Sequence, residues 1–201
     1  MAIIDAYNMQ YEIVNGLGGN EGLPLGAVSA SHGRKVVTLT TRSKPQGDFL
    51  NYWQMGSQVK TIPVESIHPS VHSLHTIDQT RDSRVILCAG GDTKGILIAV
   101  SFDGHFDLVA KIEFEQKVCR VRRLAHSDIF MVGGVGSLHF VEFRDRKLTL
   151  LATLPRLGEH VISWIQNRGQ EVYLLDEEGR TLRTLKFGFD LERFDRDIMP
   201  G

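Results

Sequence analysis

Cysteine is scarce in this chain of 201 residues, which contains two, Cys88 and Cys119. Both lie inside apolar runs and lack the paired spacing of a disulfide framework. Isolated cysteines in apolar runs are typical of buried thiols in a reducing compartment. We therefore expect a cytoplasmic protein, with the nucleus and the cytoskeleton left open.

The chain also lacks an excess of charge of either sign. Lys and Arg total 23 against 24 for Asp and Glu, for a formal net charge of -1. No overall field draws such a protein toward nucleic acid or an acidic membrane. No apolar run is long enough to span a bilayer, and the N-terminus carries Asp5 where a signal sequence needs apolar residues. We therefore expect protein partners, with neither nucleic acid nor membrane among them.

Motifs of catalysis and nucleotide binding are missing as well. The glycines of residues 15–24 invite comparison with the dinucleotide fingerprint, but Glu21 stands at the third glycine position and Pro24 follows where a helix must start. No Ser-nucleophile elbow, P-loop or kinase motif occurs. We therefore expect a protein without catalytic residues, cofactor or bound metal.

What the chain does contain is a repeated pattern of apolar strands and turns. Residues 84–91 and 95–104 form an apolar run, a Gly-rich turn, a second run and an Asp-Gly turn. Further strand patterns at 71–77 and 106–114 flank them. Together they predict one four-stranded antiparallel meander of about 45 residues, the size of a propeller blade.

This unit recurs along the chain. Similar meanders are expected at 26–64 and 118–154, and a fourth, at 161–187, lacks a clear fourth strand. The second strands align at Val36, Val85, Ile129 and Val172, with steps of about 49, 44 and 43 residues. The pattern predicts an all-β fold of propeller-like repeats with about four blades.

The runs Val85-Ile-Leu-Cys-Ala-Gly-Gly91 and Ile129-Phe-Met-Val-Gly-Gly134 resemble the second-strand signature of WD-repeat propellers. The family's Gly-His and Trp-Asp pairs are absent, and Tyr52-Trp53, followed by Gln54, is the nearest match to the latter. The resemblance implies a divergent, WD-like propeller. It further implies a non-catalytic protein-interaction scaffold that is a subunit of a larger complex.

The resemblance covers the region that we take as the propeller, residues 25–188, between an N-terminal segment, 1–24, and a tail, 189–201. Four units are few for this family. Either a strand at 6–14 supplies the missing outer strand of the fourth unit and closes a small ring, or the chain is part of a larger ring. In the second case, strand addition by another chain would complete the propeller. The tail has apolar residues near helical spacing and is expected to form a short amphipathic turn.

Loops between second and third strands, and loops between blades, emerge on one face of a propeller. We call this the loop face, and its mixed charge suits a protein partner. The expected protein-binding residues are the charged side chains of these loops and one tryptophan: Lys44, Lys94, Lys117, Arg156, His160 and Trp53. For Trp53, packing between blades is the competing interpretation.

The alternative function is an enzyme or ligand-binding protein that uses the central channel as a pocket. Apolar residues at the starts of the first strands, Ala27, Val71, Val118 and Val161, do not favour it.

Three local features are candidates for a metal site or a catalytic group. His72 and His75 fall on opposite faces of one expected strand and cannot clamp a metal together. Cys119 has arginines at 120, 122 and 123, which would lower a thiol pKa, but a packed residue on a strand with a basic face is favoured. The acidic residues 176–178 precede a glycine and suit a solvated hairpin turn.

Overall fold

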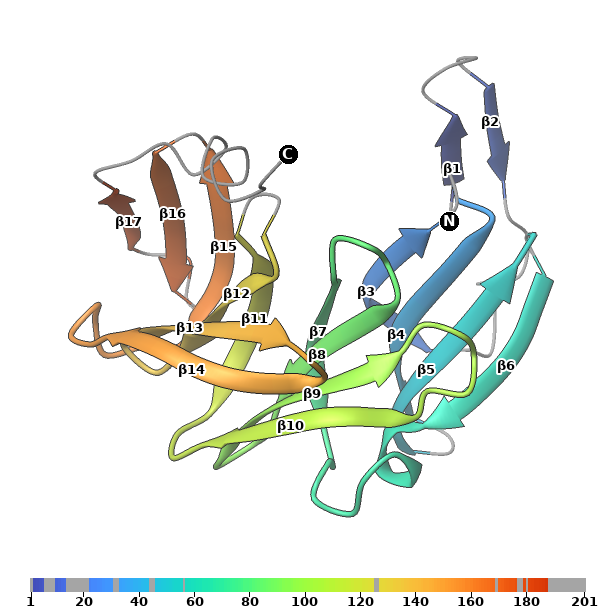
Figure 1. The fold of residues 1–201 in the computed structure, drawn as a ribbon, viewed down its shortest axis with the longest axis horizontal. Helices are drawn as coiled ribbons and strands as arrows, with labels where there is room; N and C mark the ends of the chain where they lie inside the picture. Colours follow the sequence, from blue (N-terminus) through green and yellow to red (C-terminus); the bar gives the residue numbers. More distant parts are fainter. Residues whose placement is uncertain are drawn as a thin grey trace.

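The computed structural model describes residues 2–5, 10–13, 22–30, 33–43, 46–55, 57–124, 127–168, 170–176, 179 and 181–187. Within them the chain forms four blade-like antiparallel sheets. Figure 1 shows these sheets in an arc, with the first and the fourth at its two ends. This confirms an all-β fold of four-stranded, propeller-like meanders.

The first two sheets each contain four strands in simple sequential order. The first sheet consists of β3 (Leu23–Ala30), β4 (Lys35–Ser43), β5 (Gln46–Gln54) and β6 (Ser57–Pro63). A short 3-10 helix, η1 (Val64–Ser66), leads to the second sheet. The second sheet consists of β7 (Leu74–Gln79), β8 (Val85–Gly90), β9 (Gly95–Ser101) and β10 (Leu108–Phe114).

The third sheet repeats this order and the fourth is shorter by one strand. The third consists of β11 (Val118–Arg123), β12 (Ile129–Gly134), β13 (Ser137–Arg144) and β14 (Lys147–Leu154). The fourth consists of β15 (Ile162–Arg168), β16 (Glu171–Asp176) and β17 (Leu182–Lys186). The four predicted second strands are β4, β8, β12 and β16, as the repeat spacing indicated.

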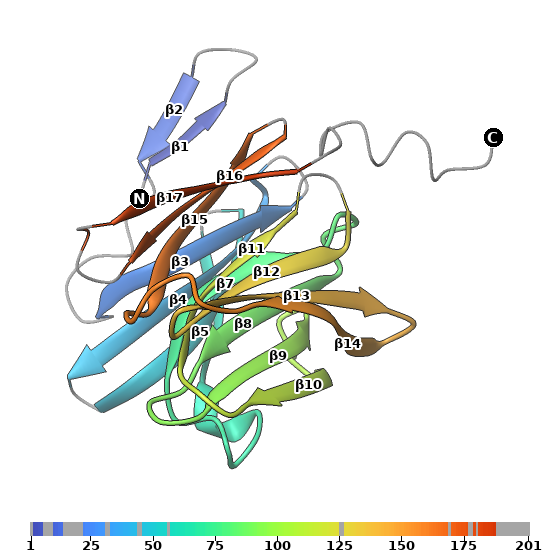
Figure 2. The same cartoon turned by 90° about the vertical axis from the view of Figure 1, so that its left-hand side faces the viewer.

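The first strand of each sheet lies on the inside of the arc, and the last lies outside (Figures 1 and 2). We call β3, β7, β11 and β15 the inner strands. Each has a register shift near its start, where one residue is unmatched in the partner strand: Leu25, His75, Cys119 and Ser163. Such a bulge increases local twist and changes which face the following side chains occupy.

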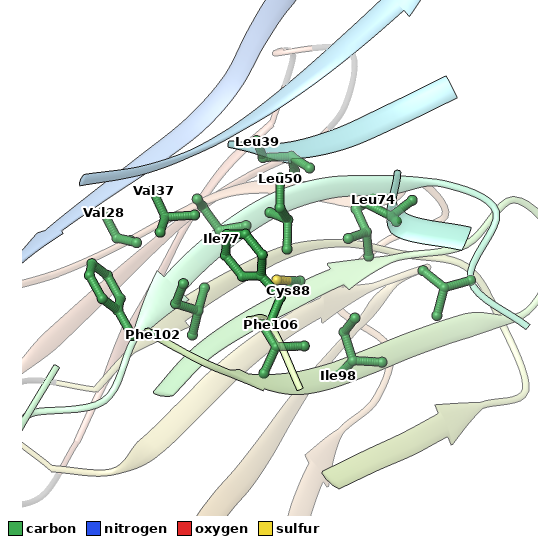
Figure 3. Packing of buried hydrophobic residues seen from close by; sticks show 14 of the residues in the cluster. Val28, Val37, Leu39, Leu50, Leu74, Ile77, Cys88, Ile98, Phe102 and Phe106 are labelled. Carbon is green, nitrogen blue, oxygen red and sulfur yellow. The ribbon is translucent and has the colours of Figure 1, made fainter. Parts of the chain in front are cut away.

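Apolar side chains fill the space between neighbouring sheets. The first cluster joins sheets one and two and includes Leu39, Leu50 and Ile98, none of which is exposed (Figure 3). A second cluster joins sheets two and three, and a third joins sheets three and four. The second and third sheets are thus layers with apolar residues on both faces, which explains the long apolar runs of β8 and β9.

Polar bonds add to these contacts at the sheet boundaries. The Asp48 carboxylate accepts a hydrogen bond of 2.8 Å from the Leu74 backbone N–H, joining sheet one to sheet two. The Gln79 side-chain amide donates to the Ser29 carbonyl at 2.8 Å. These bonds fix the start and the end of β7 against the first sheet.

The N-terminal segment differs from the expectation of one strand over 6–14. The described residues form a hairpin in which β1 (Ala2–Asp5) pairs with β2 (Gln10–Ile13) in a separate two-stranded sheet. β2 therefore does not supply the outer strand of the fourth sheet, whose described strands are β15, β16 and β17 alone. Residues 6–9 and 14, and the tail at 189–201, lie outside the described residues.

Two expected strand starts were also wrong. β7 begins at Leu74 rather than at residue 71, and β10 begins at Leu108 rather than at residue 106. Leu74 is held by Asp48, and Phe106 has a φ of 59°, which interrupts an extended strand. The Gly-rich and Asp-Gly turns were predicted correctly, since Gly91 and Gly104 have φ of 106° and 83°.

Candidate functional site: the inner channel and the loop face

All four inner strands line one cavity, which we call the inner channel. Its volume is about 290 Å³. The lining residues come from β3, β7, β11 and β15: Ala27, Val28, Ser29, Asp78, Gln79, Arg122, Arg123 and Asn167. Most of them lie near the carboxyl ends of their strands, so the cavity lies at the end of the strands opposite the loop face.

Positive charge dominates the β11 side of the inner channel. Arg122 and Arg123 line the cavity, and Arg120 stands earlier on the same strand. Asp78 of β7 faces them: its Oδ2 accepts a 2.8 Å bond from the Arg123 backbone N–H and lies 3.9 Å from an Arg122 guanidinium nitrogen. Burial, and then the nearby Arg122, lower the pKa of Arg120, while Asp78 acts in the opposite direction.

Four side chains on β7 and β11 each bury a polar atom that has no hydrogen-bond partner among the described residues. The atoms are His75 Nε2, Gln79 Oε1, Arg120 Nε and one terminal nitrogen of Arg123. Buried polar atoms are nearly always paired in proteins, and a cluster of exceptions needs a physical explanation. These four atoms lie on two adjacent inner strands, which marks this region as a candidate binding site.

The overall arrangement is shared with known structures. It is similar to the Dos1 propeller, with a TM-score of 0.65 and 8% identity, over 93% of this chain and 46% of that chain. It is similar to Sqt1 of Chaetomium thermophilum, solved with the N-terminus of ribosomal protein L10 bound, with a TM-score of 0.64 and 12% identity, over 92% and 55% of the two chains. It is also similar to the C-terminal WD40 domain of Sif2, with a TM-score of 0.63 and 10% identity, over 84% of this chain and 47% of that chain.

The chain has a WD40-type propeller fold. It spans about half the length of the solved propellers that it matches. No protein-family model and no curated protein matches it. In a propeller the blades surround a central channel, so the inner channel occupies the position of part of that channel.

The loop face of this WD40-type fold carries the predicted charged residues that the structure describes. Lys94 lies in the β8–β9 turn and Lys117 lies between β10 and β11. Arg156 and His160 lie in the β14–β15 loop, and both are exposed. Lys44 lies outside the described residues. That these residues bind a protein stays a prediction.

His160 also lines a second cavity, of about 370 Å³, at the loop end of the fourth sheet. Glu159, Asp176, Thr181 and Arg183 line it with His160. The β14–β15 loop is held to the β12–β13 turn, because the His160 carbonyl accepts a bond from the Gly136 N–H at 2.9 Å. The mixed charges of this cavity match those expected of the loop face.

Trp53 is not an exposed anchor. Its side chain is 4% exposed, and its indole N–H donates to the Thr38 hydroxyl at 3.1 Å. It lies on the face of the first sheet opposite to Leu50 and Tyr52, which point toward the second sheet. Trp53 is therefore buried, unlike the exposed anchor that was expected, but it does not pack between two of the described sheets. That it binds a protein stays a prediction.

The other candidates for chemistry are separated in the structure. His72 precedes β7, is exposed and lies 3.9 Å from a Glu65 carboxylate oxygen, whereas His75 is half-buried. Neither Cys88, which is buried, nor Cys119, which is half-buried, forms a disulfide. In the part of the chain that the structure describes, no three His, Cys, Asp or Glu side chains are grouped to hold a metal. Among the same residues, no helix has the length and apolar character needed to cross a bilayer.

Sequence reasoning tested the wrong end of the channel. Val71, Val118 and Val161 at the loop end are apolar and buried. Ala27, which was expected at the start of its strand, instead lies within β3 and lines the inner channel. The polar residues lie toward the other end, where Arg122 and Arg123 had been interpreted only as the basic face of a strand. The three arginines in Cys119-Arg-Val-Arg-Arg123 were the available signal, but the direction of each depends on the bulge at residue 119.

Proposed function

We propose that this chain is a non-catalytic protein-interaction scaffold of the WD-repeat type and a subunit of a larger complex. The observation that carries this proposal is the face of the fourth sheet that points away from the third sheet, which we call its outer face. Two cysteines that do not form a disulfide further support a reducing compartment, and we propose the cytoplasm as the site of action.

The outer face of the fourth sheet presents a row of apolar side chains. Trp164 of β15 pairs with Leu175 of β16, which pairs with Leu182 of β17, so the three side chains form a cross-strand row. Trp164 is 39% exposed and Leu182 is 62% exposed. Exposed aromatic and aliphatic residues in one row are typical of an interaction surface.

The other sheets show what such a face contacts in this fold. Each sheet from the first to the third buries apolar side chains against the next sheet. The fourth sheet uses its other face in the same way, through Val172 and Leu174. A further β-sheet is therefore the complementary surface for Trp164 and Leu182, and the greater length of the matched propellers agrees with this.

We assign this surface to a β-sheet supplied by a different protein. Among the described residues the fourth sheet has three strands where the others have four, so β17 is in the position of a third strand. Addition of a strand from the partner to β17 would complete the blade through main-chain hydrogen bonds. The exposed row would then be covered by the partner's adjoining sheet.

The test uses three variants of the purified chain. Trp164→Asp and Leu182→Asp place a charge on the row, and Leu151→Asp is the control, because Leu151 is 49% exposed on the outer strand of the third sheet. A partner isolated with the wild-type chain and then purified should bind at least about tenfold more weakly to the first two variants, since burying an unpaired charge costs several kcal/mol. Binding to Leu151→Asp should be unchanged.

Light scattering on a size-exclusion column and fluorescence quenching complete the test. The fluorescence of Trp164, obtained by difference from Trp164→Phe, should be quenched by acrylamide in the free chain and protected in the complex. Equal binding of the partner to all variants would disprove the proposal. A homodimer that Trp164→Asp dissociates would assign the face to a second copy instead.

A further inference from the structure

We propose that the inner channel binds a small polyanion, whose phosphate or carboxylate groups are held by the guanidinium groups of Arg120, Arg122 and Arg123. This inference is independent of the proposed scaffold function, which concerns the fourth sheet. It assigns a class of ligand to the inner channel. The sequence had suggested a pocket in the central channel without a ligand.

The first argument is the shape of the site. The inner channel is lined from all four inner strands, so its walls are strands packed in a rigid scaffold rather than loops. Its volume of about 290 Å³ is near the lower end of the usual range for small-molecule sites, about 300–1,000 Å³. It is several times the volume of a water molecule, about 30 Å³.

The second argument is the charge at the site. Arg122 and Arg123 of β11 line the cavity, and Arg120 lies close enough to Arg122 and Asp78 to feel both charges. The one carboxylate beside them, Asp78, already accepts bonds from the backbone N–H groups of Gln79 and Arg123. The Arg122 guanidinium is 3.9 Å from Asp78, beyond hydrogen-bond distance. The guanidinium groups therefore keep donors for another acceptor, and the local excess of positive charge selects an anion.

The third argument is the set of unpaired donors. Arg120 Nε and a terminal nitrogen of Arg123 are buried without a hydrogen-bond partner in the part of the chain that the structure describes. A buried, unpaired charged donor is costly, and planar guanidinium groups are suited to the two oxygens of a carboxylate or phosphate. Desolvation lowers the pKa of Arg120, which agrees with a guanidinium held partly away from water. An anion in the channel would supply the missing acceptors.

The remaining wall offers neutral hydrogen-bonding groups. Gln79 of β7 and Asn167 of β15 line the cavity from opposite sides of β11. Gln79 uses its amide nitrogen to bond Ser29, and its buried oxygen is unpaired. That oxygen can accept a bond from a hydroxyl or a protonated oxygen of the ligand. The ligand class is therefore a compact polyanion that also carries a hydrogen-bond donor.

Calorimetric titration of the purified chain tests this proposal. Sodium pyrophosphate and citrate are the probes, with ionic strength held constant by sodium chloride. We expect saturable binding of at least one probe at one site per chain. A preference for pyrophosphate would assign a phosphate ligand, and a preference for citrate would assign a carboxylate ligand. If neither probe binds saturably, the proposal is overturned.

Charge-removing variants locate the site. Arg122→Gln and Arg123→Gln should each weaken binding by about tenfold or more, because each removes a charge-assisted hydrogen bond. Arg144→Gln is the control, because this side chain is 76% exposed in the turn between β13 and β14. Equal weakening by Arg144→Gln would show a general charge effect and overturn the assignment. Far-ultraviolet circular dichroism shows whether each variant is folded.

A further variant, Arg120→Met, tests whether the missing partner of Arg120 is an anion or an ordered water molecule. If Arg120 awaits a ligand, Arg120→Met should raise the Tm of the ligand-free chain, because an unpaired buried charge is replaced by an apolar side chain of similar length. The same variant should lose most of the Tm increase that the anion produces. A lower Tm with the anion effect retained would show that water satisfies Arg120, and would overturn the proposal.

Discussion

At the scale of single residues, the buried polar groups of the first sheet contrast with those of the inner channel. Asn51 is fully buried, and its amide donates to the Thr40 and Thr38 hydroxyls at 3.0 and 3.3 Å. Its oxygen accepts from the Thr61 hydroxyl at 2.9 Å. Trp53 bonds Thr38 in the same group. The network is satisfied from within the chain and is therefore structural, unlike the unpaired donors of β11.

The first prediction concerns Asn51. Asn51→Ala should lower the free energy of unfolding by about 2–3 kcal/mol, because the buried Thr38 and Thr40 hydroxyls and the half-buried Thr61 hydroxyl lose their common partner and a cavity remains. Urea denaturation measures the change. The control is Gln54→Ala, since Gln54 is exposed on the same strand and should change stability by less than about 0.5 kcal/mol. Equal effects would contradict a structural role for the network.

The second prediction concerns the pH dependence of stability. Complete burial raises the pKa of the Cys88 thiol, so the folded chain keeps this proton at a pH where the unfolded chain releases it. The contribution is fully present below the unfolded pKa of about 8.5 and is lost as pH rises above it. The slope should approach about 1.4 kcal/mol per pH unit.

Urea denaturation between pH 7 and pH 10.5 or so tests this expectation. Lysines and tyrosines also titrate in this range, so the relevant quantity is the difference between wild type and Cys88→Ala. That difference should decrease with pH above about 8.5, because only the wild type has the thiol. A difference that does not change with pH would show that the Cys88 thiol ionises freely in the folded state.

At the scale of the element, tight turns and close approaches fix where strands begin and end. The β8–β9 turn follows Gly90, whose position would place a Cβ atom 2.2 Å from the Ser73 carbonyl oxygen and 2.6 Å from the Leu74 Cα. Both of those atoms belong to the backbone and cannot move like a flexible side chain. The small residues that end the apolar run are therefore required by the contact between the turn and the start of β7.

The third prediction follows from this contact. Gly90→Ala should destabilise the chain by about 3 kcal/mol, because the backbone at Ser73 must shift. Gly179→Ala is the matched control: no atom lies within 4 Å of the added Cβ, and the φ of 67° alone should cost about 1 kcal/mol. Thermal denaturation of both variants provides the comparison. A smaller effect at residue 90 than at 179 would contradict the close contact.

At the scale of the whole molecule, burial is unequal along the arc. The strands β8 and β9 are buried along almost their whole length, whereas β14 and β17 are exposed at most positions. In repeat proteins each unit is stabilised mainly by its neighbours, so end units and outer strands open more readily. The second and third sheets both have a neighbour on each side, and the second sheet, whose β8 and β9 are more completely buried than β13, should be the most stable part.

The fourth prediction is the resulting order of hydrogen exchange. Amide exchange followed by mass spectrometry should be slowest in β8 and β9, and faster by about tenfold or more in β17, because the opening free energy falls by more than about 1.4 kcal/mol. An equally slow β17 in the isolated chain would mean that the fourth sheet does not need a partner to be stable, which would also weaken the proposed function. Slower exchange in β17 after a partner binds would support that function.

The sequence by itself determined the all-β class, the four repeats and the second strands at Val36, Val85, Ile129 and Val172, because alternation and turn residues are local properties of the chain. It also indicated that the fourth unit has three strands.

Only the tertiary structure decided which side chains meet. The bulges at His75 and Cys119 rotate the following residues, and the packing of neighbouring sheets then brings Asp78 close to Arg122 and leaves Trp164 exposed. It likewise decided that Trp53 is buried and that β2 pairs with β1. These outcomes depend on twist and on contacts between residues far apart in the chain, which a pattern with a period of two residues does not contain.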